Sequence, residues 1–285
     1  MKPLIIQSDF GYSDGAVCAM HGVAYGVNPD LAIHDLTHDI PPYDIWEGSC
    51  RLAQTIPYWP EGSVFVSVVD PGVGSSRLSV VVETATGHYI VTPDNGSITH
   101  IASHFGINHA RIIDEEINRL PGSSHSYTFH GRDIYAYTGA RLAAGVIDFS
   151  HVGPSIDHGS LITLPVVAPH ISDHQVTGVI DTHDVRYGSL WTNIPRAMFE
   201  KLEAPYGDYV LTRIRSNSGD VYSAPLRLCR SFADVSVGEA LIYVNSLDNM
   251  AIAINRGSFA RAYRVGQGTS WSVEFTYPLP STTTC

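Results

Sequence analysis

The sequence is poor in cysteine and in positive charge, and it has no long apolar run. Its four cysteines show no CxxC spacing, so we expect reduced thiols and neither a zinc knuckle nor a disulfide framework. Seventeen Lys and Arg stand against 28 Asp and Glu, a formal net charge of −11. This acidity disfavours nucleic acid as a partner. No apolar run is as long as a membrane span or a signal peptide, which predicts a cytoplasmic protein without membrane contact.

The common nucleotide and metal motifs are missing as well. There is no GxGxxG in the first turn and no GxxxxGK[ST] anywhere, so Rossmann hydride transfer and P-loop chemistry lose support. HExxH is also absent. His34 and His38 are four residues apart, but they flank a predicted strand end, where this spacing does not create one face. The sequence supports no metal site, and we predict none.

The first half of the chain predicts an α/β domain over residues 1–160. Short β-branched runs alternate with amphipathic stretches, which indicates a largely parallel sheet. The expected strands are Pro3–Gln7, Leu31–Asp35, Val64–Val69, Leu78–Thr84 and His88–Val91. The expected helices are Ala16–Val27, Tyr43–Thr55, Ile98–Phe105 and Asp133–Ala144.

The second half predicts a smaller antiparallel β domain, either a barrel or a sandwich, over residues 175–278. A segment rich in Pro, His and Ser indicates a linker at 161–174, and residues 279–285 are expected to be frayed. Turn signals such as SNSGD and NSLDN separate short alternating runs, as in small barrels. The expected strands are Gln175–Ile180, Ser189–Ile194, Tyr209–Arg213, Ala240–Val244 and Met250–Ile254.

Four polar clusters follow predicted strands of the first half, where the loops of an open α/β sheet form binding crevices. They are SDFG (8–11), DPGVGSSR (70–77), PDNG (93–96) and FHGRD (129–133). One such cluster would be an ordinary turn, because Asp, Asn, Gly and Pro are turn formers. Four clusters at one sheet edge favour a functional site.

Three residues in these clusters have both a structural and a functional interpretation. Asp9 either caps the helix that starts near Ala16 or accepts hydrogen bonds from a ribose diol. Asp70 ends the apolar strand VFVSVV, and its partner Arg77 returns across the turn. That pair either braces the turn or belongs to an active site. His130 is either a packed loop histidine or a proton acceptor.

Together the motifs resemble the S-adenosyl-L-methionine hydroxide adenosyltransferase family, which also contains the fluorinase and chlorinase enzymes. The resemblance spans nearly the whole chain. It rests on SDFG, DLTHDIPPYD (35–44), VVDPGVGSSR (68–77), TPDNG (92–96), TFHGRD (128–133), GSLWTNI (188–194) and NSLDNMAIAIN (245–255).

The resemblance implies a homotrimer whose subunits have an α/β N-terminal domain and a β-barrel C-terminal domain. Each site then lies between the N-domain of one subunit and the C-domain of its neighbour. It implies hydrolysis of S-adenosyl-L-methionine at ribose C5′ to adenosine and L-methionine, without a cofactor. The family's hydrolytic set falls on Asp70, Arg77 and His130. The implied substrate-binding residues are Asp9 at the ribose, Asp94 and Asn95 in the PDNG turn, Trp191 and Phe232 at the adenine, Ser189, and Asp181 at the methionine amino group, with Asp184 fitting the spacing equally well.

Two departures from the family pattern bear on the substrate. Where members read D-x-x-F-G-N, this chain reads from Asp181 to Ser189 over a longer stretch, with serine in place of asparagine. The additional loop of the halogenating branch is missing after Asp70, which favours water over halide. The alternatives are a halogenase that uses chloride, a non-catalytic sensor of S-adenosyl-L-methionine or adenosine, and an unrelated α/β protein.

Overall fold

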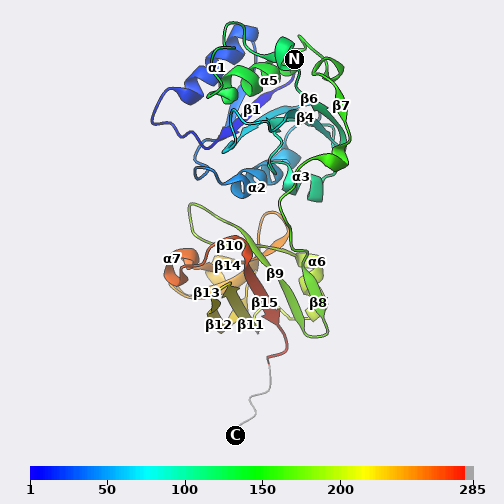
Figure 1. Ribbon diagram of the computed structural model, residues 1–285. Helices are drawn as coiled ribbons and strands as arrows, with labels where there is room; N and C mark the ends of the chain where they lie inside the picture. Colours follow the sequence, from blue (N-terminus) through cyan, green and yellow to red (C-terminus); the bar gives the residue numbers. More distant parts are fainter. Residues whose placement is uncertain (280–285) are drawn as a thin grey trace. The chain divides into compact units, whose positions relative to one another are not determined.

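The computed structural model describes residues 1–279, and they form two compact units (Figure 1). The first unit is Met1–Leu164, and the second begins at Pro165. The predicted fold class, an α/β domain followed by a β-barrel, is confirmed. Within the described residues, no helix combines the length and apolar character that a membrane crossing requires.

The first unit contains a seven-stranded sheet in the order β2-β1-β3-β5-β4-β6-β7. β1, β2, β3 and β5 pair in parallel, whereas β4 and β7 run against their neighbours. The elements are β1 (Leu4–Ser8), α1 (Ala16–Val27), β2 (Ile33–Thr37), α2 (Ile45–Thr55), β3 (Val64–Val68), β4 (Ser79–Thr84), β5 (Tyr89–Pro93), α3 (Thr99–His104), β6 (Ile107–Ile112), α4 (Glu115–Asn118), η2 (Gly131–Ala136), α5 (Tyr137–Ala144) and β7 (Ser155–Ile156).

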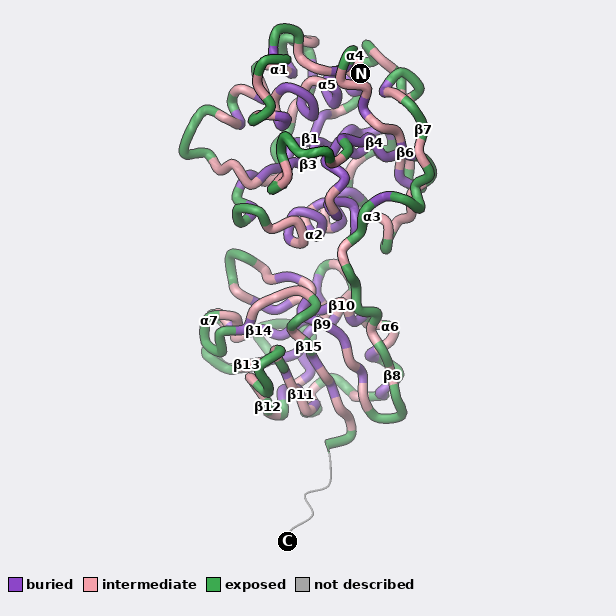
Figure 2. Tube along the Cα trace, viewed as in Figure 1, coloured by how far each residue is buried: buried purple, intermediate pink, exposed green. Residues whose placement is uncertain are grey.

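Helices cover both faces of this sheet, so its central strands are buried on both sides (Figures 1 and 2). In β1, Leu4 and Ile6 pack into the core that includes Met20 of α1, whereas Ile5 packs with Leu52 of α2. The alternation of side chains along a strand separates these two cores. Burial on both faces explains the continuous apolar runs of β1 and β3.

The second unit is a closed barrel of seven strands in the order β10-β14-β13-β12-β11-β15-β9, and β9 pairs again with β10. β8 pairs with the start of β9 outside the closed ring. The elements are β8 (His170–Ser172), β9 (Gln175–His183), β10 (Leu190–Pro195), α6 (Arg196–Phe199), β11 (Tyr209–Ser216), β12 (Gly219–Leu228), β13 (Ala240–Val244), β14 (Asn249–Ile254), α7 (Phe259–Tyr263) and β15 (Gly268–Thr276).

The structure differs from the sequence-based expectation in several elements. The helix expected from Asp133 begins at Gly131, and its first six residues form the π-helical turn η2. The expected linker 161–174 ends in strand β8, which gains its hydrogen bonds from the start of β9. β12 and β13 pair in parallel within the otherwise antiparallel barrel. The expected frayed tail lies, apart from Leu279, outside the described residues.

Candidate active site

The carboxyl ends of β1, β3 and β5 bring three of the expected clusters to one edge of the sheet. These strands are parallel neighbours, and Ser8 is in register with Val68. The Asp9 N–H donates to the Val68 carbonyl at 3.4 Å, so the Asp9 turn lies beside the strand end that leads to Asp70. Burial raises the pKa of Asp9, the Tyr43 N–H opposes this, and the Asp70 charge raises it further.

The turn after β3 returns Arg77 to Asp70. The Val73 N–H donates to the Asp70 carbonyl at 3.3 Å, and Gly74 has a φ of 80°, which glycine adopts without steric cost. Arg77 Nε donates to Asp70 Oδ1 at 2.7 Å, and Arg77 Nη2 pairs with Oδ2. Only 9% of the Arg77 side chain and 4% of the Asp70 side chain are exposed. The pair is therefore a bidentate ion pair in a largely dry setting.

His130 joins this pair from the start of η2. Its Nδ1 lies 3.1 Å from Arg77 Nη2, and the residue is 5% exposed. Because a guanidinium can only donate, Nδ1 accepts and the imidazole is neutral with its proton on Nε2. His130, which lies 53 residues after Arg77 in the sequence, thus joins Asp70 and Arg77 in one connected triad.

The electrostatic surroundings keep His130 neutral. Burial lowers the pKa of His130, and Arg77 lowers it further. Arg119 adds to this effect, with Nη2 at 3.5 Å from His130 Nε2, whereas Glu115 opposes it. A neutral imidazole remains available to accept the Arg77 N–H at neutral pH.

Gly131 permits the close approach of the His130 segment to the SDFG turn. A Cβ atom at this position would lie 2.9 Å from Cε2 and 3.0 Å from Cζ of Phe10, and 3.4 Å from Val68. Phe10 and Phe129 pack edge to face with ring centroids 5.7 Å apart. The glycine of the HGRD motif therefore sets how His130 lies against the Asp9 turn.

The remaining candidates of the first unit make bonds that brace its loops. The Asp9 carboxylate accepts the Tyr43 N–H at 2.8 Å, and at the start of α1 it is Asp14 that accepts the Ala16 N–H, at 2.9 Å, so the helix-cap interpretation of Asp9 is wrong. Asp94 accepts the Ile162 N–H at 2.8 Å, and Asn95 donates to the Val69 carbonyl at 2.9 Å. Asn95 thus holds the strand end that carries Asp70. Substrate binding by Asp94 and Asn95 stays a prediction.

The barrel carries a pocket of about 550 Å³ that contains two of the expected residues, Ser189 and Phe232. A volume of this size is typical of small-ligand sites. Gly188 shapes it, because its φ is 70° and a Cβ there would lie 1.9 Å from Ser258 Oγ. The lining residues are Arg186, Tyr187, Ser189, Phe232, Ile254, Asn255, Arg256, Gly257 and Ser258.

Two further barrel candidates, Trp191 and Asp184, neighbour residues of this pocket in the fold. Trp191 packs against the cluster that contains Cys229 and Tyr243, and the Phe232 ring lies 4.9 Å from the Tyr243 ring. Asp184 begins the turn to Gly188, whose N–H donates to the Asp184 carbonyl at 2.7 Å. Asp181 lies within β9, which is three residues longer than expected.

Comparison with known proteins identifies the family of this chain. The model of the SAM hydroxide adenosyltransferase N-terminal domain matches residues 4–153, and that of the C-terminal domain matches residues 178–272. The chain belongs to the SAM hydroxide adenosyltransferase family. The resemblance expected from the motifs is thereby confirmed.

Several family relatives match along most of their length. The (R)-S-adenosyl-L-methionine hydrolase of Salinispora tropica is 34% identical over 92% of this chain and 93% of its own. That of Methanocaldococcus jannaschii is 37% identical over 76% and 74%. A fluorinase of Nocardia brasiliensis is 29% identical over 96% and 97%. The crystal structure of an uncharacterized conserved protein from Thermotoga maritima has a TM-score of 0.86 at 31% identity, covering 96% and 99%.

Sequence reasoning missed part of the pocket of this SAM hydroxide adenosyltransferase family member. Asn255, Arg256 and Ser258 follow β14 directly, as NRGS follows the apolar run MAIAI. A polar cluster after an apolar strand is the signal that located the triad in the first half. The same rule, applied to the barrel, would have found this loop. Arg186 and Tyr187 carry no comparable signal, because they lie in the stretch that departs from the family pattern.

Proposed function

We propose that this chain hydrolyses S-adenosyl-L-methionine at ribose C5′ and releases adenosine and L-methionine. The observation that carries this proposal is the connected triad of Asp70, Arg77 and His130. Support comes from the hydrolase relatives at 32–37% identity, whereas the fluorinase relatives are 27–29% identical.

The chemistry of the substrate explains why so few groups are needed. Water attacks C5′, the C5′–S bond breaks, and sulfur leaves with the electron pair as the neutral thioether of methionine. No general acid is required, because no charge develops on the leaving group. The attacking oxygen becomes an oxonium, which is far more acidic than a carboxylic acid. A weak base therefore suffices to remove its proton, and we propose that the reaction is metal-independent and uses no cofactor.

Asp70 is the group that we assign to the water. Each of its oxygens accepts from Arg77, yet a carboxylate offers about four acceptor positions, so two remain for the nucleophile. The acceptor nitrogen of His130 is already engaged by Arg77. In this assignment Asp70 orients water and takes its proton, while Arg77 and His130 hold the carboxylate in place.

Replacing Asp70 tests this role. Asp70→Asn keeps the shape but removes the charge and the base. We expect kcat to fall about 10²–10⁴-fold, measured as adenosine formed at saturating substrate, while ligand binding measured by calorimetry is largely kept. Full activity of this variant would contradict the mechanism.

Substrate binding is assigned to the two units together. Asp9 accepts hydrogen bonds from the ribose hydroxyls, with Asp94 and Asn95 in the neighbouring turn. In the barrel, Trp191 and Phe232 bind the adenine, and Ser189 belongs to the stretch that recognises the methionine end. Asp181 or Asp184 binds the methionine amino group, and Arg186 and Arg256 of the pocket provide positive charge for its carboxylate.

We also propose a homotrimer in which the barrel pocket of one subunit serves the triad of its neighbour. A mixture of two inactive variants tests this directly. Asp70→Asn lacks the triad, and Phe232→Ala combined with Arg256→Ala lacks the pocket. Subunit exchange at a 1:1 ratio would restore about a quarter of the sites if they lie between subunits. No recovery, with exchange verified by mass spectrometry, would place the whole site within one chain.

Product analysis separates this function from its alternatives. Incubation with S-adenosyl-L-methionine in ¹⁸O-labelled water should yield adenosine with the heavy oxygen at C5′. A halogenated nucleoside formed only with chloride would indicate a halogenase. Binding without turnover would indicate a sensor. The described cysteines Cys18, Cys50 and Cys229 form no disulfide, which fits the reducing cytoplasm that we propose as the compartment of this chain.

A further inference from the structure

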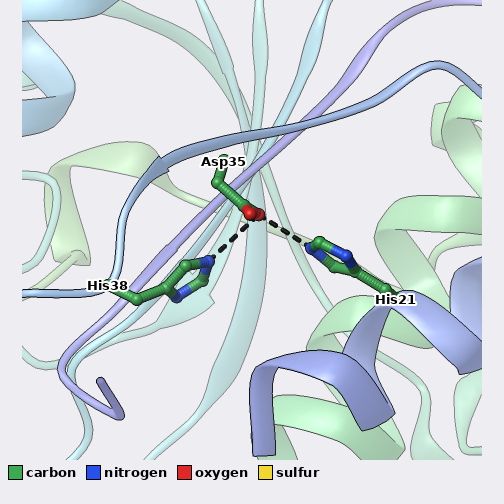
Figure 3. A group of neighbouring side chains, drawn as sticks. All are labelled: His21, Asp35 and His38. Carbon is green, nitrogen blue, oxygen red and sulfur yellow. Dashed lines mark hydrogen bonds and ion pairs between the residues drawn. The ribbon is translucent and has the colours of Figure 1, made fainter. Parts of the chain in front are cut away.

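A second polar cluster, formed by His21, Asp35 and His38, lies outside the triad (Figure 3). Nε2 of His21 is 2.7 Å from Asp35 Oδ1, and Nε2 of His38 is 3.1 Å from the same oxygen. The two imidazoles approach that oxygen from opposite sides (Figure 3). Three potential ligand atoms thus lie within 4.8 Å of one another.

Three separate segments bring these residues together. His21 is on α1, Asp35 is on the edge strand β2, and His38 follows that strand. The His38 side chain is fully buried, whereas His21 and Asp35 are 28% and 27% exposed. The cluster therefore has a rigid inner side and an outer side that is open to solvent.

The groups around the cluster fix its members in a way that suits a metal ligand. Ser8 Oγ lies 2.6 Å from His38 Nδ1, so Nδ1–H can donate to Ser8 when Nε2 carries an ion. Tyr12 donates to Asp35 Oδ2 at 3.0 Å and leaves Oδ1 for the ion.

We propose that His21, Asp35 and His38 bind one divalent transition-metal ion of the zinc class through two imidazole nitrogens and one carboxylate oxygen. Zn²⁺ takes such ligands at about 2.0–2.2 Å, which places neighbouring ligand atoms roughly 3.3 Å apart in a tetrahedral site. To reach this spacing, the His21 nitrogen moves about 0.6 Å away from Asp35 Oδ1, and the two imidazole nitrogens turn toward one another. Solvent supplies the fourth ligand on the exposed side.

Such an ion would stabilise the turn that carries Asp9. It would join α1 and β2 through His21 and Asp35. His38 links it to that turn twice, because its carbonyl accepts the Gly11 N–H at 2.8 Å and its Nδ1 contacts Ser8. The ion has a structural role here and does not touch the reacting atoms.

Titration calorimetry of the full chain with Zn²⁺, after treatment with a chelator, tests the site. We expect one equivalent of Zn²⁺ to bind at this site. His21→Gln and Asp35→Asn should each raise the Kd of that equivalent at least about 10-fold. Mg²⁺ should not bind, because it prefers oxygen ligands. Free Zn²⁺ at 100 times its Kd should raise the melting temperature by about 5–10 °C in the wild type and less in the variants.

The exposed His151–Asp148 pair provides a matched control. Its Nδ1–Oδ1 distance is 2.8 Å, and within residues 1–279 no third ligand atom joins it. His151→Gln should therefore leave zinc binding unchanged. Absence of bound zinc in the wild type, or wild-type binding by both His21→Gln and Asp35→Asn, would overturn the proposal. The measurement uses no substrate, so its failure would leave the proposed hydrolysis untouched.

Discussion

Substitution of Gly131 by alanine should damage the active site through sterics alone. The added methyl group would lie 2.9 and 3.0 Å from two ring carbons of Phe10, whereas ordinary carbon contacts are about 3.5–4.0 Å. Either η2 or Phe10 must therefore move by roughly 0.5–1 Å. Phe10 follows Asp9, and Gly131 follows His130, so either movement displaces a residue of the proposed site.

The expected magnitude follows from the tight packing. Overpacking of a buried position costs about 1–3 kcal/mol, which corresponds to a fall in melting temperature of roughly 3–10 °C for a unit of this size. A misplacement of about 1 Å at a catalytic group lowers activity on the order of 10²-fold. Gly131→Ala should thus show a moderate loss of stability and a larger loss of kcat/KM.

A thermal melt and a steady-state assay of adenosine release measure both effects. Gly26→Ala is the matched control, because Gly26 lies on α1 and a Cβ there meets no atom within 4 Å. That control should gain about 0.4–1 kcal/mol of stability at unchanged kcat/KM. A Gly131→Ala protein with wild-type melting temperature and wild-type kcat/KM would refute the steric argument.

Three further predictions concern pH and substrate binding. Burial and neighbouring arginines lower the pKa of His130, so kcat/KM should fall only below pH about 6.5. Arg119→Gln should shift this acidic fall of the pH profile to higher pH, and an unchanged profile would show that Arg119 does not influence the His130 pKa. Folding lowers the pKa values of His38 and His130, so the unfolded chain binds more protons in acid than the folded chain. The free energy of unfolding should therefore decrease below pH about 6.5. Equal urea midpoints at pH 7.5 and pH 5.5 would contradict this prediction. Phe232→Ala should raise KM about 10-fold, because it removes an aromatic contact with adenine of about 1–1.5 kcal/mol. A changed kcat at constant KM would argue against adenine stacking.

The sequence predicted the fold well where one physical signal dominated. The strands buried on both faces, such as Val64–Val68, are nearly unbroken apolar runs, and Gly and Pro mark their ends. β12 and β15 were not predicted, because the first five residues of each strand include no buried position and so lack the alternation of apolar and polar residues that indicates a strand. β8 was assigned to a linker because its three residues gain their structure from pairing with β9, which no local pattern reveals.

The site could be predicted only in part for a related reason. Strand-end clusters located Asp70, Arg77 and His130, since parallel strands place their carboxyl ends at one edge. The position of Arg119 beside His130, and of His21 beside Asp35, depends on how helices pack on the sheet. Spacing along the chain offers only the pair His34 and His38, whose place at a strand end argues against a shared site. In the structure His34 packs against Trp59 with ring centroids 5.0 Å apart, and His38 turns to Asp35.

The arrangement of Arg77 bears on why water should be preferred to halide. A guanidinium has five N–H donors, and the contacts to Asp70, His130 and Ser79 engage four of them. Little of its positive charge is left for an external anion, and the Asp70 carboxylate repels one. A water molecule meets no such repulsion and can donate to the carboxylate. Asp70→Asn would remove the repulsion of an anion. Weak chloride-dependent formation of a halogenated nucleoside by that variant would support this account of nucleophile selection. Stronger use of chloride by the wild type would contradict it.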